Sequence, residues 1–241
     1  MKLRLYTLMI LMGASVLSFG QQNLGPNVDA DLSLPSNLRV YALSEFDSRD
    51  KSYIGSKFLF EQFQYGKLRL ANFDQFIQDE YLLNYDLMTH SFVISQNGNL
   101  LDLPAIRVHE AVIRDPASGL EERYSVRNFD NTAVLFRDVL NGEISLLSKP
   151  HLRYIKKNYN VAIDAGNLRP RIELEEDLYV CQEGEFYELP KKEKKLLKSL
   201  SGLPSVAKFL VRHNVDPSDE NQVRSALVKL NNNLENYEIT N

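Results

Sequence analysis

The run at residues 132–149, TAVLFRDVLNGEISLLSK, constrains the fold more than any other part of the sequence. Two apolar-rich segments flank Asn141-Gly142, and this dipeptide is the strongest short-range signal for a two-residue β-hairpin turn. Both central residues of a type I′ turn need a positive φ angle, which Gly adopts freely and Asn tolerates. We therefore expect two antiparallel strands joined by a type I′ turn at Asn141-Gly142.

A related run, FLFEQFQYGKLRL, lies at residues 58–70. When the two runs are aligned on their glycines, Leu59, Phe60, Gly66 and Leu70 match Leu135, Phe136, Gly142 and Leu146. The run predicts a second hairpin with its turn at Tyr65-Gly66. Apolar residues in both runs are also spaced for one helical turn, with each glycine just past a helix end, so both interpretations fit the sequence.

Short apolar segments and turn signals alternate through the middle of the chain, a rhythm typical of all-β proteins. Residues 81–88 alternate most clearly, and Asn97-Gly98-Asn99 predicts a hairpin between 91–96 and 100–103. Further strands are expected at 37–43, 106–112, 122–129, 151–157, 169–174, 178–182 and 186–189. The predicted fold is mainly β: an antiparallel meander of about a dozen strands, which curls into a rolled sheet or open barrel rather than a sandwich to hide its edges.

The pattern changes to helical spacing near residue 190. Apolar residues spaced for a helix begin near Leu196 and again near Val206, and Asp216-Pro217 predicts an N-cap with proline at the first position of a third helix. These residues predict a small C-terminal α-helical region. We expect it to pack on the sheet or to form its own cap, and a separate helical interaction module is the functional alternative.

The first twenty residues have the features of a signal peptide. Lys2 and Arg4 precede an apolar stretch at residues 5–19, and the small residues Ser18 and Gly20 predict cleavage before Gln21. The apolar stretch is short for a permanent membrane anchor. We therefore expect an exported protein, in the periplasm or outside the cell.

This division gives the chain four expected parts: a signal peptide at 1–20, a flexible lead-in at 21–36, an antiparallel β domain at 37–189 and a C-terminal α-helical segment at 190–241. Without its signal peptide the chain carries a formal charge of about −6. A nucleic-acid-binding domain is usually strongly basic, so we expect no nucleic-acid partner. Cys181 is the only cysteine, which excludes an intramolecular disulfide, and we expect it to be a small buried strand residue.

Several segments together resemble a set of uncharacterised exported β-rich proteins of Bacteroidetes-type bacteria. They are the signal ending SFGQ, the runs LFEQFQYGKLRL and FRDVLNGEISLL, LLNYD at residues 82–86, and the short helices expected from Lys191. The resemblance implies a bacterial origin and a place in the cell envelope. It implies no activity and no catalytic residue.

Each catalytic template in the sequence lacks a necessary partner. Ser205 and Lys208 fit S-x-x-K, but the Ser-Asp-Asn and Lys-Thr-Gly elements of that enzyme class are missing. His109-Glu110 begins like a zinc-protease motif, but position 113 is Ile where the second histidine is needed. The histidines also lack metal-ligand spacing: His90, His109, His151 and His213. We therefore predict no catalytic residue, no metal site and no cofactor.

Three charged clusters remain as candidates for binding. The acidic run could attract calcium, although a solvated strand end explains it better: Glu173, Glu175, Glu176 and Asp177. A basic-aromatic patch fits an anionic polysaccharide or lipid headgroup and equally a lysine-protected strand edge: His151, Arg153, Lys156 and Lys157, with Tyr154 and Tyr159. A second basic cluster fits the solvated face of a helix: Lys191, Lys192, Lys194 and Lys195.

Two functions are consistent with these observations. The first is a non-catalytic exported β domain that binds a protein or small ligand in the cell envelope. The alternative is a hydrolase whose site assembles only in three dimensions. Two close carboxylates in a cleft, or a polar side chain with a base within hydrogen-bond reach, would favour the hydrolase, whereas an apolar cavity or patch would favour binding.

Overall fold

The structure is a computed structural model, and it describes residues 39–42, 53–77, 80–96, 99–115, 118–159 and 165–238. The expected signal peptide and lead-in, at 1–20 and 21–36, lie outside the described residues. The same holds for Asn97 and Gly98 in one of the expected turns.

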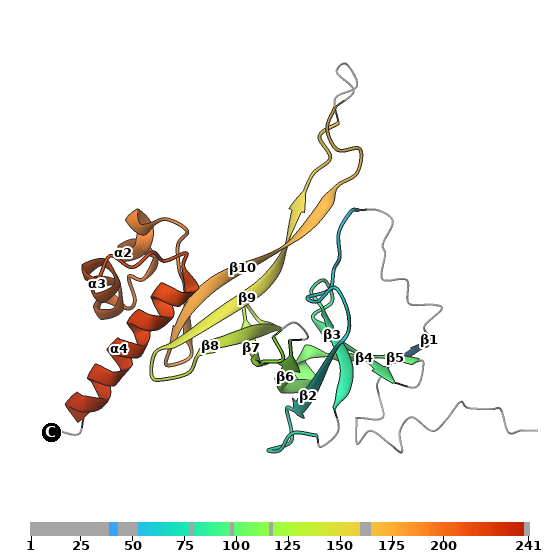
Figure 1. Cartoon of the computed structure of the whole chain (residues 1–241), viewed down its shortest axis with the longest axis horizontal. Helices are drawn as coiled ribbons and strands as arrows, with labels where there is room; N and C mark the ends of the chain where they lie inside the picture. The colour runs from blue at the N-terminus through green and yellow to red at the C-terminus, as the bar shows by residue number, and fades with distance from the viewer. Residues whose placement is uncertain are drawn as a thin grey trace, which may run out of the picture. The chain divides into compact units, whose positions relative to one another are not determined.

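One antiparallel sheet contains the eleven strands that the described residues form. They are β1 (Arg39–Ala42), β2 (Gln64–Leu70), β3 (Tyr81–Asp86), β4 (Ser91–Gln96), β5 (Asn99–Pro104), β6 (Val108–Arg114), β7 (Glu121–Phe129), β8 (Thr132–Leu140), β9 (Ser145–Ile155), β10 (Arg171–Gln182) and β11 (Glu185–Glu188). Their order is β1-β5-β4-β3-β2-β6-β7-β8-β9-β10-β11, so the sheet is open (Figure 1). The prediction of a mainly β antiparallel fold followed by helices is confirmed.

The sheet must curl between β5 and β6. These two strands are joined only by the three-residue helix η1 (Ala105–Arg107), yet β4, β3 and β2 lie between them in the sheet. Across a flat sheet that separation is at least about 19 Å, whereas the chain from Pro104 to Val108 spans at most about 14 Å. The strands from β2 to β6 therefore form a rolled part. Its interior includes fully buried side chains such as Leu68, Tyr85 and Phe92.

The predicted turn at Tyr65-Gly66 is wrong, because both residues lie within β2. Gly66 pairs with Tyr81 of β3 on one side and with Ile113 of β6 on the other. A Cβ atom on Gly66 would lie only 2.7 Å from the carbonyl oxygen of Val112. This glycine therefore permits close packing of three strands rather than a chain reversal.

The hairpin predicted around Gly142 is confirmed, but its turn differs from the prediction. β8 and β9 are antiparallel neighbours, and residues 141–144 connect them. Neither Asn141 nor Gly142 has a positive φ angle, so no type I′ turn forms there. Instead, the backbone of Ile144 exchanges two hydrogen bonds with the Asn231 side chain, at 3.1 and 3.0 Å. The helical alternative for the two glycine-centred runs is also wrong.

The hairpin of β9 and β10 is the longest in the described part of the chain. Residues 169–174 and 178–182 were expected as two strands, but β10 is continuous from Arg171 to Gln182. Its register with β9 runs from the Ile155–Arg171 pair to the Ser145–Cys181 pair. Figure 1 shows this hairpin running from the helices past the rolled part and beyond it.

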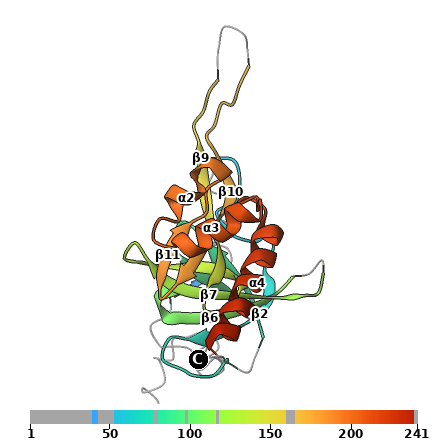
Figure 2. The ribbon, with the colours of Figure 1, turned by 90° about the vertical axis from the view of Figure 1, so that its left-hand side faces the viewer.

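The helices cover one face of the sheet beside β8, β9 and β10 (Figure 2). They are the short η2 (Glu193–Lys195) and α2 (Leu196–Ser199), followed by α3 (Pro204–Arg212) and α4 (Glu220–Glu238). Buried leucines, valines and alanines of α2, α3 and α4 pack on Ile144, Leu146 and Val180. Packing on the sheet, as expected from the sequence, is confirmed. No helix in the described residues has the length and apolar character needed to cross a membrane.

The predicted N-cap of the last helix is wrong by three residues. Asp219 caps α4, because its carboxylate accepts hydrogen bonds from the backbone N–H groups of Asn221 and Gln222, at 3.0 and 3.1 Å. Asp216 instead accepts a bond from the N–H of Ser218, at 2.9 Å. That bond closes a local Asx turn, which places the intervening proline before the helix.

Candidate functional site

A gap opens where β9 leaves β8. The register between these strands begins at the Arg137–Ser148 pair, so the residues of β9 beyond Ser148 pair only with β10. Pro150 lies just past this point and has no N–H group to donate to a neighbouring strand. Proline in a sheet is tolerated where one side of its strand has no ladder partner. The position of Pro150 therefore agrees with the separation of the two strands.

This gap forms a cleft of about 490 Å³, which the turn after β3 closes from one side. Most of its lining is apolar: Tyr85, Leu87, Met88, Phe129, Val134, Leu135, Pro150, Leu152, Tyr154 and Ile172. The polar lining residues are His90, Asp130, Thr132, Lys149 and His151. Met88 and Tyr154 are 46% and 59% exposed. An apolar pocket with a few polar groups is the usual form of a small-molecule site.

The turn that carries His90 is held in place by Asp86. The Asp86 carboxylate accepts hydrogen bonds from the N–H groups of Met88 and Thr89, at 2.9 and 3.2 Å, and pairs with Lys57 at 2.6 Å. His90 itself has a φ angle of 52°, a left-handed conformation that is costly for a residue with a side chain. The backbone of His90 is thereby fixed beside the cleft, and the Nδ1 atom of its imidazole lies 3.4 Å from the Tyr85 hydroxyl.

Lys149 is a cation without an ion-pair partner among the described residues. Its ammonium lies 4.2 Å from the ring centre of Phe129 and 5.6 Å from that of Tyr179. Burial lowers the pKa of His90, and the nearby charge of Lys149 lowers it further. His90 is therefore neutral at neutral pH, and the cleft offers the positive charge of Lys149 and the carboxylate of Asp130 beside an uncharged imidazole.

The structure brings two of the four histidines to this cleft. His151 lines it together with His90, and the Nδ1 atom of His151 lies 3.4 Å from the Asp177 carboxylate. His109 and His213 lie elsewhere, on β6 and after α3. No group of three or more potential metal ligands occurs among the described residues.

The acidic run and the lower part of the basic-aromatic patch neutralise each other across β9 and β10. Arg153 pairs with Glu173 at 2.5 Å and with Glu175 at 3.0 Å. Arg171 also pairs with Glu173, and Lys191 approaches Glu175 to 3.5 Å. We call these pairs the ion-pair ladder. Because its carboxylates already face cations, the solvated-strand interpretation fits this run better than a calcium site does.

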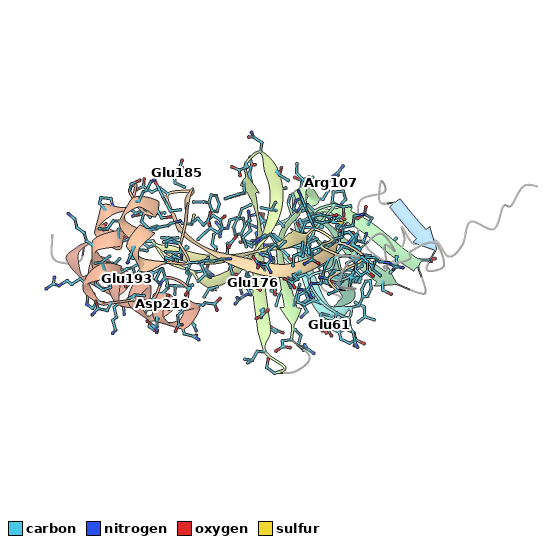
Figure 3. All side chains as sticks on the ribbon, turned by 90° about the horizontal axis from the view of Figure 1, so that it is seen from above. Glu61, Arg107, Glu176, Glu185, Glu193 and Asp216 are labelled. Carbon is cyan, nitrogen blue, oxygen red and sulfur yellow. The ribbon has the colours of Figure 1, made fainter. Side chains whose placement is uncertain are left out.

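Glu176 points to the other side of β10. In Figure 3 it lies between the helical region, where Glu193 and Asp216 are labelled, and the rolled part of the sheet. Arg137 donates hydrogen bonds to Glu176 at 2.8 Å and to Glu220 of α4 at 2.7 Å, and Ser148 donates to Glu176 at 2.5 Å. Burial alone would raise the pKa of Glu176, but these donors hold it below its ordinary value. This polar junction connects the sheet to the start of α4.

The catalytic motifs noted in the sequence are not assembled into a site. Glu110 is buried and pairs with Arg69 at 2.7 Å and with Arg123 at 3.1 Å. Ser205 and Lys208 are both exposed on α3. Cys181 is buried in β10, and this burial raises the pKa of its thiol, which disfavours the thiolate needed for nucleophilic attack.

One serine–carboxylate pair was not predicted from the sequence. The hydroxyl of Ser125 on β7 donates to Asp138 on β8 at 2.6 Å. Burial raises the pKa of Asp138, while Ser125 and Arg127 partly oppose that effect. The two residues meet only through the pairing of neighbouring strands, which no local sequence pattern specifies.

Comparisons with protein-family models, curated proteins and solved structures found no match for this chain. The candidate site is therefore defined by its geometry. The cleft combines aromatic and aliphatic walls with Lys149, whose charge is available, and His90, which can donate or accept a hydrogen bond. Such a lining can hold a ligand by contact and charge.

Proposed function

We propose that this chain is an exported protein of the cell envelope whose β domain binds a small ligand without transforming it. The observation that carries the proposal is the open cleft beside β9, with an available positive charge at Lys149. Export rests on the signal-peptide features of residues 1–20 and on the resemblance to exported β-rich proteins of Bacteroidetes-type bacteria. The intact mass of protein recovered from its own host tests export, because a cleaved chain lacks residues 1–20 and an uncleaved chain contradicts it.

The lining of the cleft favours a ligand with an apolar or aromatic body and one anionic group. The apolar body would lie against the rings of Phe129 and Tyr154, which still expose surface that the ligand would remove from water. The anionic group would meet Lys149, and hydrogen bonds to charged groups are stronger than those between neutral groups. His90, neutral and fixed, would supply a directional hydrogen bond.

Fluorescence titration with anilinonaphthalene sulfonate tests this binding, because the probe joins aromatic rings to one sulfonate. We expect the mature protein to bind it and Lys149→Met to weaken the affinity at least roughly tenfold, since the lost charge-assisted bond is replaced by an apolar contact. Lys198→Met is the matched control, because Lys198 is exposed on α2 and far from the cleft lining. Equal affinity of the Lys149→Met variant and the wild type would show that the cleft does not bind the probe through this charge.

A hydrolase is the second candidate, and the Ser125–Asp138 pair is the observation that favours it. A carboxylate with a raised pKa that accepts from a serine hydroxyl is a possible base. Ser125 is only 8% exposed, however, and neither residue lines the cleft beside β9. A nucleophile must reach its substrate, so this geometry favours binding over hydrolysis.

A further inference from the structure

The outermost described residues of the β9–β10 hairpin form a cationic surface. Beyond the Ile155–Arg171 pair, the two limbs are joined again where the N–H of Asn158 donates to the carbonyl of Asn167, at 3.2 Å, and the N–H of Asn167 donates to the Asn158 side chain, at 2.8 Å. Between these two ties one limb carries Lys156 and Lys157, and the other carries Leu168, Arg169 and Pro170. We call Lys156, Lys157, Leu168 and Arg169 the hairpin end.

The charges of the hairpin end differ from those of the ladder below it. Lys156, Lys157 and Arg169 are exposed and form no ion pair with any residue that the structure describes. No Asp or Glu lies among the described residues 155–159 and 165–171. The mature chain as a whole is acidic. A local excess of positive charge on an acidic protein favours contact with an anionic surface at the hairpin end.

The hairpin end also exposes an apolar side chain among its cations. Leu168 is 69% exposed, one of the highest exposures of any large apolar residue in the described part. A soluble anionic polymer offers positive side chains a partner but gives a leucine no apolar phase to enter. A lipid surface offers both, because basic residues attract anionic headgroups while apolar side chains enter the acyl boundary.

We propose that the hairpin end docks this protein onto a lipid surface that carries anionic headgroups. The hairpin end lies on the two-stranded arm of β9 and β10, beyond the Ile155–Arg171 pair (Figure 1). The cleft is lined by other residues of this hairpin, Lys149 to Leu152, Tyr154 and Ile172. Docking and ligand binding use different residues, apart from sharing the same hairpin. Residues 160–164 lie outside the described part and are not included in the surface.

Vesicle flotation of the mature protein tests this inference. We expect binding to vesicles of phosphatidylglycerol and phosphatidylcholine in equal parts and little binding to pure phosphatidylcholine. Each basic residue near an anionic surface contributes roughly a fivefold factor, so K156Q/K157Q/R169Q should lower the partition coefficient on the order of 100-fold. Leu168→Ser should lower it by a smaller factor, because it removes only the apolar contact.

The matched control is K192Q/K194Q/K195Q, which removes the same number of charges from exposed positions beside η2. This variant should retain most of the binding. An equal loss in the two triple variants, or no flotation of the wild type, would overturn the inference. Binding to soluble dextran sulfate that depends on the three cations, together with no effect of Leu168→Ser on flotation, would overturn it in favour of an anionic polymer. The Lys149→Met variant should float normally, which separates this test from that of the cleft.

Discussion

The two glycine-centred runs have matching sequences but occupy different structural positions. Gly66 lies in the middle of β2, pressed against the backbone of β6, whereas Gly142 lies in a four-residue connection beside α4. The first glycine is needed for the close approach of strands in the rolled part. Gly142 instead lies against Asn231 of α4, a helix that covers the sheet. The same local pattern thus serves strand packing in one region and helix docking in the other, and distant residues decide which.

Among the variants that test this comparison, Gly66→Ala is expected to lose the most free energy of unfolding. The new Cβ would lie 2.7 Å from the carbonyl oxygen of Val112 and 3.1 Å from Leu83, and the carbonyl is backbone within the β2–β6 ladder. We expect a loss of about 3 kcal/mol in the free energy of unfolding, measured by urea denaturation of the chain without residues 1–20. Gly184→Ala serves as a comparison for a different cause, because Gly184 has open space around it and a φ angle of 83°, so its loss comes from the left-handed backbone alone. An unfolding free energy of Gly66→Ala equal to that of the wild type would mean that the close approach is unimportant.

A smaller effect is expected at the contact between Gly142 and Asn231. Asn231→Ala leaves the buried N–H and C=O groups of Ile144 without their partner, which should cost about 2 kcal/mol. Gly142→Ala places its Cβ 2.5 Å from the Asn231 amide nitrogen and should cost about 1 kcal/mol by displacing it. In the Asn231→Ala background this second cost should largely disappear. Additive costs in this double-mutant cycle would contradict the contact. Asn221→Ala, in the same helix, serves as the control.

The smallest effect is expected from Arg137→Gln, which alters the polar junction. The variant should lose about 1 kcal/mol at neutral pH, because both partners of Arg137 are partly exposed. The pKa of Glu176 is held below its ordinary value of 4.5 in the folded state. Its stabilising contribution is therefore complete above that value and is lost as the pH falls through the folded pKa.

Stability measured across this acidic range should fall less steeply in Arg137→Gln than in the wild type. Arg153→Gln is the matched control, since Arg153 lies on the exposed ion-pair ladder and should change stability less. A steeper acid loss in Arg137→Gln would contradict the assigned role of the junction.

The strands and helices were largely predictable because their signals are local. Alternation from Tyr81 to Asp86 and the apolar residues of α3 each define an element without reference to distant residues. The N-cap of α4 was also readable, since Asp219 and Gln222 have capping-box spacing, and the Gln222 side chain donates to Asp219 at 2.9 Å. The prediction of an N-cap at Asp216-Pro217 was wrong because that pair forms a turn.

The other failed predictions concern features made by residues far apart in the sequence. Ile144 and Asn231 are separated by 87 positions, and no turn rule includes such a partner. The cleft likewise depends on where β9 leaves β8, and Pro150 was its only local indication. The basic-aromatic patch was found from the sequence as one unit, but the structure divides it. His151 and Arg153 face acids on β10, whereas Lys156 and Lys157 do not.

The short helix η1 has a consequence for how this chain acquires its structure. Because η1 leads directly from β5 to β6, the pairing of β6 with β2 must close a loop that contains β3, β4 and β5. Non-local pairings of this kind slow folding, whereas β7 to β11 add one hairpin at a time. Chains emerge from their N-terminal end during synthesis, so the slow closure belongs to the segment that emerges first. The later strands and helices then pack on a rolled part in which β6 is already in place to pair with β7.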